Sequence, residues 1–220
     1  MKKDLFNTIV SDILSDDFFS GYKFTRLKNM LLLSNGNEFV CAELEHWRDY
    51  EDESCVIRPI YGRHFDILAK WFEKYDVIIP LKLQRSSLQI MRYNQGPEEE
   101  REITFKYDFS DYEEKFPQLC SKLKENITEL YEEYATLNDF YNKIVVPEIT
   151  GERELPNTGA NWMFVYLTLG FLIDRDNYPT LKVKFLERAE WLLNHHELSV
   201  AEYYDRMDEI ISYMENNVKL

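Results

Sequence analysis

One regular pattern of apolar residues dominates the second half of this chain. Between residues 123 and 144, apolar side chains recur at alternating four- and three-residue steps. This spacing places them on one stripe of a helix about three heptads long. The members of the stripe are Leu123, Ile127, Leu130, Tyr134, Leu137, Tyr141 and Ile144. The sequence therefore predicts a single long helix that begins near Pro117 and ends before Pro147.

Period-two alternation of apolar and polar residues is typical of the first 110 residues instead. It predicts strands over residues 23–28, 30–33, 38–47, 55–60, 87–93 and 102–107. Asn35-Gly36 predicts a tight hairpin turn, because a primed turn needs positive φ at its centre. Helical spacing predicts helices over residues 3–15 and 64–75. The inward face of the first is either Leu5, Ile9 and Ile13 or Phe6, Val10 and Leu14.

Three further helices are predicted over residues 160–173, 180–195 and 199–216, after a polar linker at 151–159. Each helix has an apolar stripe that another element must cover. We therefore expect an α+β fold: an N-terminal helix and a mostly antiparallel sheet with a short helix, followed by a C-terminal antiparallel helical bundle packed on it. Residues 1–110 would form a mixed α+β subdomain and residues 111–220 a helical one, together one compact unit. The alternative is that one stripe forms the seam of a dimer, so we expect a monomer or a homodimer.

Charge is distributed unevenly along the chain, whose formal net charge is −14. Residues 1–110 hold 15 basic and 19 acidic side chains, and residues 111–220 hold 11 and 21, so the halves carry −4 and −10. This field would repel a phosphate backbone, which disfavours nucleic-acid binding, and would attract a basic protein partner. An acidic loop offers four candidate residues for contact with such a partner, namely Asp49, Glu51, Asp52 and Glu53.

The stretch from residue 58 to residue 92 differs in charge, with seven basic and three acidic side chains. If its basic side chains converge, the planar fork of arginine suits a phosphate or a carboxylate. The candidate anion-binding residues are Arg58, Arg63, His64 and Arg92. His64 beside Asp66 is also the most enzyme-like pair, although no nucleophile accompanies it. The alternative is that the basic side chains alternate outward and pair with the surplus acids.

Several short motifs resemble functional signatures but have simpler explanations. Leu155-Pro156-Asn157-Thr158-Gly159 spells a wall-sorting pattern, yet the apolar run after it, 162–173, is too short to cross a bilayer. His195 and His196 are adjacent, so they do not chelate a metal as an i, i+4 pair would, and a helix terminus explains them. Residues 174–177 predict a plain turn rather than a calcium loop. Phosphate-binding-loop, zinc-protease and esterase motifs do not occur, so no catalytic residue is assigned.

Cysteine usage and the N-terminus indicate a cytoplasmic protein. Cys41, Cys55 and Cys120 are widely spaced and form no CxxC pair, so neither a disulfide framework nor a metal site is expected. Aspartates at positions 12, 16 and 17 interrupt the apolar core that a signal peptide would need. We expect no cofactor, no metal and no membrane attachment.

A resemblance to a known group of proteins is carried by one stretch, Cys55-Val-Ile-Arg-Pro-Ile-Tyr-Gly-Arg-His-Phe-Asp-Ile-Leu-Ala-Lys-Trp-Phe-Glu-Lys. With the order of helix, hairpin-rich sheet and short aromatic helix, residues 1–110 resemble small bacterial proteins of unknown function. Some of these are grouped with immunity proteins of polymorphic toxin systems, which implies a toxin-neutralising role. We therefore expect a non-enzymatic acidic protein that binds a basic protein partner. The alternative is an enzyme or an anion-binding protein that uses the basic residues named above.

Overall fold

The computed structural model describes residues 4–26, 29–36, 38–49, 53–75, 90–92, 101–152, 160–195 and 204–219. The 155–159 motif, His196, the first residues of the predicted 199–216 helix and most of the predicted 87–93 strand lie outside these ranges. The chain divides into two compact units, Met1–His64 with Ile90–Glu133 and Phe65–Gln89 with Tyr134–Leu220. An antiparallel sheet and a helical C-terminal region confirm the predicted α+β fold class.

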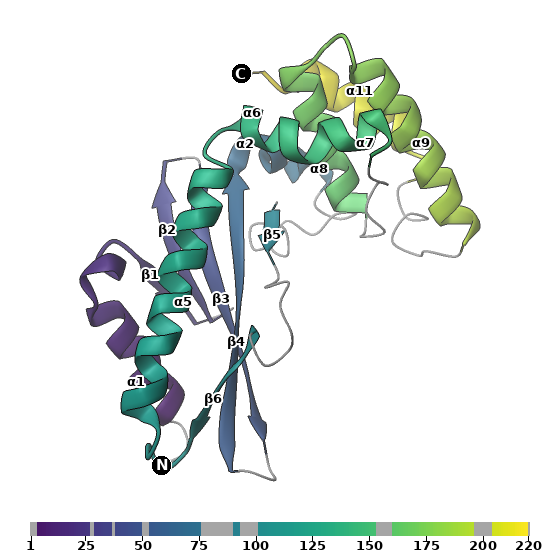
Figure 1. The fold of residues 1–220 in the computed structure, drawn as a ribbon. Coiled ribbons are helices and arrows are strands. Elements are labelled where there is room, and N and C mark those ends of the chain that lie inside the picture. The colour runs from purple at the N-terminus through teal and green to yellow at the C-terminus, as the bar shows by residue number, and fades with distance from the viewer. Residues whose placement is uncertain are drawn as a thin grey trace. The chain divides into compact units, whose positions relative to one another are not determined.

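The first unit is built on an antiparallel sheet that has six strands within the described residues (Figure 1). They are β1 (Lys23–Thr25), β2 (Met30–Asn35), β3 (Glu38–Asp49), β4 (Ser54–Phe65), β5 (Ile90–Arg92) and β6 (Ile103–Lys106). The order along the sheet is β1-β2-β3-β4-β5. β6 also pairs with β4, at the end of that strand opposite to the part that pairs with β5.

The β2–β3 hairpin confirms the predicted turn, shifted by one residue. Asn35 pairs with Glu38, so Asn35 ends its strand and Gly36 begins the connection. Gly36 has a φ of 63°, a left-handed conformation that glycine adopts without a steric penalty.

Two helices lie on the same face of this sheet, α1 (Asp4–Ser15) and α5 (Tyr112–Glu133) (Figure 1). α1 buries Leu5, Ile9 and Ile13, which is the first of the two predicted inward faces. Tyr112 near the start of α5 donates a hydrogen bond of 2.6 Å to Asp12 of α1. The two helices therefore form one layer over the sheet.

β3 presents alternate side chains to the helical layer, as its period-two pattern predicts. Val40, Ala42 and Leu44 are buried on that side. The next residue of the series, His46, stacks on Phe6 of α1. The same alternation places Phe39, Glu45 and Trp47 on the other face of the sheet.

The prediction of one long helix is wrong, because the helix is interrupted after Glu133. The chain continues as α6 (Leu137–Phe140), a π-helical turn η3 (Tyr141–Val145) and α7 (Val146–Thr150). Thr136 caps α6 by accepting from the Asp139 backbone N–H, and the Asp139 carboxylate accepts from the Thr136 backbone N–H. This reciprocal capping box starts a new helix, so the apolar stripe is divided between the two units.

The predicted start of the short helix at His64 is also wrong. β4 continues to Phe65, and helix α2 (Asp66–Ala69) begins at the next residue. It continues as the 3-10 segment η2 (Lys70–Tyr75). His64 is therefore a strand residue, and its ring stacks on Phe39 at a centroid distance of 4.3 Å.

The second unit is helical within the described residues. Besides α2, η2, α6, η3 and α7, it contains α8 (Ala160–Ile173), α9 (Tyr178–Asn194) and α11 (Met207–Asn217). Residues 163–171 of α8 are buried without interruption, which identifies α8 as the central helix of this unit. Trp71 Nε1 donates to the Thr168 hydroxyl at 3.0 Å and joins η2 to α8. Among the described helices, none combines the length and the apolar character that crossing a bilayer requires.

The division into two units differs from the predicted boundary at residue 110. α5 packs on the sheet and belongs to the first unit, although it lies in the half that was expected to be helical. α2 and η2 follow β4 directly in the sequence but belong to the helical unit. Both differences have one cause. An apolar stripe shows that one side of a helix must pack against another element, but it does not show which element that is.

Candidate functional site

Arg58 lies on the face of β4 that points away from α1 and α5, where carboxylates surround it. Its Nη2 atom lies 2.7 Å from Glu45 Oε2, and its Nη1 atom lies 3.6 Å from Glu102 Oε1. The guanidinium also lies 5.1 Å from the centre of the Trp47 ring. These contacts show Arg58 in ion pairs that link β4 to β3 and to the start of β6.

Arg63 lies on the opposite face of β4, since its position differs from that of Arg58 by an odd number of residues. Its side chain is 1% exposed, and Nη2 lies 2.6 Å from Glu38 Oε2. Its guanidinium lies 4.9 Å from the centre of the Tyr131 ring on α5. His64 points to the same face as Arg58 and is buried against Phe39.

The predicted anion-binding residues are therefore divided between two faces of the sheet. Arg92 pairs with Tyr61 in the β4–β5 register, and its side chain lies outside the described part of the structure. Arg58 and Arg63 each bind a carboxylate of their own chain, but Arg63 is buried and does not point outward as the alternative interpretation expects.

The predicted acidic loop follows β3 in the sequence and precedes β4, and the structure describes only its first and last candidate residues. Asp49 is the last residue of β3, and Glu53 is an exposed turn residue with a φ of 48°. The Glu53 carbonyl accepts a hydrogen bond of 3.3 Å from the Tyr107 backbone. Glu51 and Asp52 lie outside the described residues.

Part of the basic stretch does converge, in the helical unit. Lys70 and Lys74 of η2 line a hollow of about 440 Å³ together with Lys219. Lys74 Nζ lies 4.2 Å from the centre of the Tyr213 ring and 3.9 Å from Glu209 Oε1. All three lysines are exposed.

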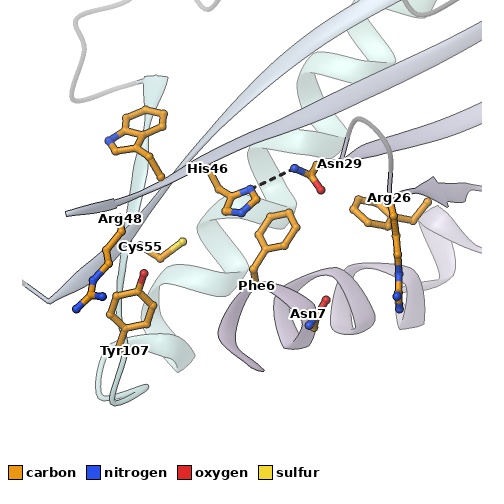
Figure 2. A pocket seen from close by; sticks show the side chains of 10 residues that line it. Phe6, Asn7, Arg26, Asn29, His46, Arg48, Cys55 and Tyr107 are labelled. Carbon is orange, nitrogen blue, oxygen red and sulfur yellow. Dashed lines mark hydrogen bonds between the residues drawn. The ribbon is translucent and has the colours of Figure 1, made fainter. Parts of the chain in front are cut away.

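A larger hollow, of about 740 Å³, lies in the first unit at one end of the sheet (Figure 2). We call it the aromatic–basic hollow. Its lining combines five aromatic or imidazole rings with two arginines, two amides and a thiol: Phe6, Asn7, Phe24, Arg26, Asn29, His46, Trp47, Arg48, Cys55 and Tyr107. They come from α1, β1, the β1–β2 connection, β3, β4 and the segment after β6, so only the tertiary fold brings them together.

Two stacked rings stand in the middle of the aromatic–basic hollow. The rings of Phe6 and His46 are 3.9 Å apart at an interplanar angle of 16°. Asn29 Nδ2 lies 3.4 Å from His46 Nδ1. Phe24 lies 6.3 Å from Phe6, on the β1 side of the stack.

The charged groups flank this stack on either side. Figure 2 shows Arg26 and Asn7 on one side and Arg48 and Tyr107 on the other. The Arg48 guanidinium lies 5.6 Å from the centre of the Tyr107 ring. None of the described lining residues is acidic, although acidic residues outnumber basic ones by 40 to 26 in the whole chain.

Cys55 is the one sulfur nucleophile among these lining residues, and its environment keeps it protonated. Its side chain is buried, and desolvation raises the pKa of the thiol to about 11. A thiol reacts as its thiolate, which is scarce at neutral pH at such a pKa. The Cys55 thiol is therefore not activated as a nucleophile.

Sequence reasoning did not identify the aromatic–basic hollow. The available signal was one face of β3. The apolar residues of that face are followed, in the same period-two series, by His46 and Arg48. Where one face of a strand changes from apolar to polar residues, the strand leaves the hydrophobic core. The partners of these two side chains are far away in sequence, so their convergence was not predictable from spacing.

A third surface feature is the outward side of α5. Leu123, Ile127 and Leu130 are buried beneath the helix. The opposite side carries exposed carboxylates at helical spacing: Glu114, Glu125, Glu129 and Glu132. We call this row the acidic stripe. Steps of four and three residues keep its last three members on one face of the helix.

A scan of protein-family models, a search of curated proteins and a search of solved structures each gave no match to this chain.

Proposed function

We propose that this protein is a non-enzymatic binding protein that engages a basic protein partner through the acidic stripe of α5. The observation that carries this proposal is the fixed row of exposed carboxylates on a helix whose other side is anchored in the core of the first unit. In an acidic chain, such a row would steer a basic partner and raise its association rate.

The geometry of the stripe supports this proposal in two ways. Glu125 and Glu132 are seven residues apart on one helix, so their Cα atoms lie about 10 Å apart along a rigid axis. Neither of these two glutamates forms an ion pair with another described residue, so their charge faces solvent. A partner would gain charge-assisted hydrogen bonds here without displacing an internal partner of either carboxylate.

The paired state of the predicted basic residues supports a binding role over the alternative. Arg58 and Arg63 are neutralised by Glu45 and Glu38, which lowers their capacity to hold a further anion. A basic toxin is the partner class that the resemblance of residues 1–110 implies. With such a partner, the protein would act as a cytoplasmic immunity protein, neutralising the toxin by occupying its basic surface.

Charge neutralisation on α5 tests the proposal. The triple variant Glu125→Gln, Glu129→Gln and Glu132→Gln removes three charges without changing side-chain size. The matched control neutralises three exposed acids of the helical unit, Glu187→Gln, Glu190→Gln and Asp208→Asn. Each protein is immobilised and exposed to lysate of its own host at about 50 mM and at about 300 mM salt. The Debye screening length differs about twofold between these two conditions.

We expect the wild-type protein and the control to retain one basic protein at low salt and to release it at high salt. The α5 variant should retain about tenfold less, because the charges that steer association are gone. Retention that is equal for the α5 variant, or that is indifferent to salt, would contradict the proposal. Co-expression then tests the immunity role: the captured partner should arrest growth alone and should not do so with the wild-type chain.

A further inference from the structure

We infer that the aromatic–basic hollow binds a small organic anion that combines one planar ring with a single carboxylate or phosphate group. This site is separate from the acidic stripe and does not depend on the proposed protein partner. The hollow has a volume of about 740 Å³. Ligand sites in proteins typically measure about 300–1,000 Å³, so a molecule of roughly ten to twenty-five heavy atoms fits.

The charge of the residues that line the hollow favours an anionic ligand. The chain carries a net charge of −14, yet the described lining of the hollow holds two arginines and no carboxylate. Arg26 is exposed and forms no hydrogen bond or ion pair with another described residue. Its guanidinium therefore keeps its donors for a ligand. Since the planar fork matches a carboxylate or a phosphate, the anionic group of the ligand belongs at Arg26.

Ring surfaces select a planar molecule. Phe24 precedes Arg26 by two residues and lines the same hollow, and its ring lies 6.3 Å from Phe6 of the stacked Phe6–His46 pair. A ligand ring placed against these faces would gain stacking and apolar burial, and its anionic group would reach Arg26. The Asn7 side chain lies on the same side of the stack as Arg26 (Figure 2).

The same charges exclude a polymer. A nucleic acid would bring many phosphates against a chain of net charge −14, whereas a single anionic group needs one local cation. The ligand class is therefore an aromatic carboxylate or a mononucleotide. Both have the same chemistry, a ring and one anionic group, and the choice between them is made by the test.

Titration with paired probes tests the inference on the full chain. Indole-3-acetate and AMP are the charged probes, indole-3-acetamide and adenosine are their neutral counterparts, and acetate and inorganic phosphate are anions without a ring. Binding is measured by calorimetry and by chemical-shift changes at the His46 ring. We expect at least one charged aromatic probe to bind about tenfold or more tightly than its neutral counterpart and its ring-free anion.

Two variants locate the site. Arg26→Gln should abolish the preference for the charged probe, because it removes the charge and keeps a polar side chain. Arg175→Gln, at an exposed arginine of the helical unit, should leave that preference unchanged. Phe24→Leu should weaken the aromatic probe about fivefold or more through the loss of stacking.

Each outcome decides the inference. Preference for indole-3-acetate identifies an aromatic carboxylate as the ligand class, and preference for AMP identifies a mononucleotide. The inference would be overturned if charged and neutral probes bound with equal affinity, or if the wild-type and Arg26→Gln proteins bound the charged probe with equal affinity. It would also be overturned if acetate or inorganic phosphate bound as tightly as the charged aromatic probe. Absence of binding by both charged aromatic probes at about 10 mM would overturn it too, since that affinity is weaker than a built site provides.

Discussion

The ion pair between Arg63 and Glu38 joins a buried cation to a partly exposed carboxylate, and this asymmetry makes a specific prediction. The side chain of Arg63 is 1% exposed and that of Glu38 is 27% exposed, with 2.6 Å between Nη2 and Oε2. Removing the carboxylate leaves a charge in the interior without this counter-charge. Removing the guanidinium leaves a carboxylate that can turn toward water.

The magnitudes follow from this geometry. With charge centres about 4 Å apart and an effective dielectric constant of about 20, the attraction is about 4 kcal/mol. Glu38→Gln loses this attraction but keeps a neutral acceptor worth about 1 kcal/mol, so we expect the free energy of unfolding to fall by about 3 kcal/mol. Arg63→Met loses the contact with Tyr131 but fills the space with apolar volume, and we expect a fall of about 1–2 kcal/mol.

Urea titrations followed by circular dichroism measure these changes, and hydrogen exchange of β3 and β4 amides gives a local measurement. The local measurement is needed because a chain with two compact units need not unfold in a single transition. The double variant should be about as stable as Arg63→Met alone, because Glu38→Gln costs nothing further once the buried charge is gone.

A matched ion pair in the same unit supplies the control. Lys124 Nζ and Asp16 Oδ2 are also 2.6 Å apart, but their side chains are 37% and 29% exposed. Lys124→Met should therefore change the free energy of unfolding by less than about 1 kcal/mol. The reasoning fails if Arg63→Met destabilises more than Glu38→Gln, or if the effects of Arg63→Met and Glu38→Gln add in the double variant.

Three further predictions concern single groups. Hydrogen bonds to the Asp174 carboxylate, of which the one from Tyr141 has the largest effect, lower its pKa from the ordinary 3.8 to about 2. The stabilising effect of the ionised carboxylate is therefore complete above about pH 4 and is lost as the pH falls toward about 2. Tyr141→Phe should raise that pKa in an NMR titration, and an unchanged value would contradict this cause. Burial raises the pKa of the Cys55 and Cys120 thiols to about 11, so a disulfide reagent at pH 8 should modify them about tenfold more slowly in the folded protein than in urea, and equal rates would be inconsistent with burial. Thr136→Ala should lower the free energy of unfolding by about 1 kcal/mol through loss of the α6 cap, whereas Thr136→Ser should keep most of the stability.

Local periodicity predicted most elements of this fold well. α8 occupies residues 160–173 as predicted, and α1 ends at Ser15 as predicted. The alternation in β3 identified Val40, Ala42 and Leu44 as a buried face. These features depend on side chains a few residues apart, so their signal is contained in short windows of sequence.

The interrupted helix shows where a local pattern misleads. The apolar stripe continues without a break from residue 123 to residue 144, and it predicted one continuous helix. Thr136 and Asp139 contain the competing signal, a capping box that starts a new helix. Apolar spacing reports which side of a helix is buried, whereas hydrogen bonds at the backbone decide where a helix ends.

Pro59 shows the same limit for strands. Proline cannot donate a hydrogen bond to a ladder, so it usually lies at a strand end or on an edge strand. In the structure it lies inside β4, between the segment 54–57 that pairs with β6 and the segment 61–63 that pairs with β5. Among the described residues, Pro59 faces neither β5 nor β6, and both of these strands are distant from it in sequence.

The sequence by itself determined the α+β class, the acidic character of the chain and the buried faces of its main elements, because composition and short-range spacing encode them. Tertiary structure alone decided the carboxylate partners of Arg58 and Arg63, the assignment of α5 to the sheet and the convergence that forms the aromatic–basic hollow. Ion pairs and hollows are made by side chains tens of residues apart, and their distances are set by strand register and helix packing. No pattern within a short window of sequence specifies those distances.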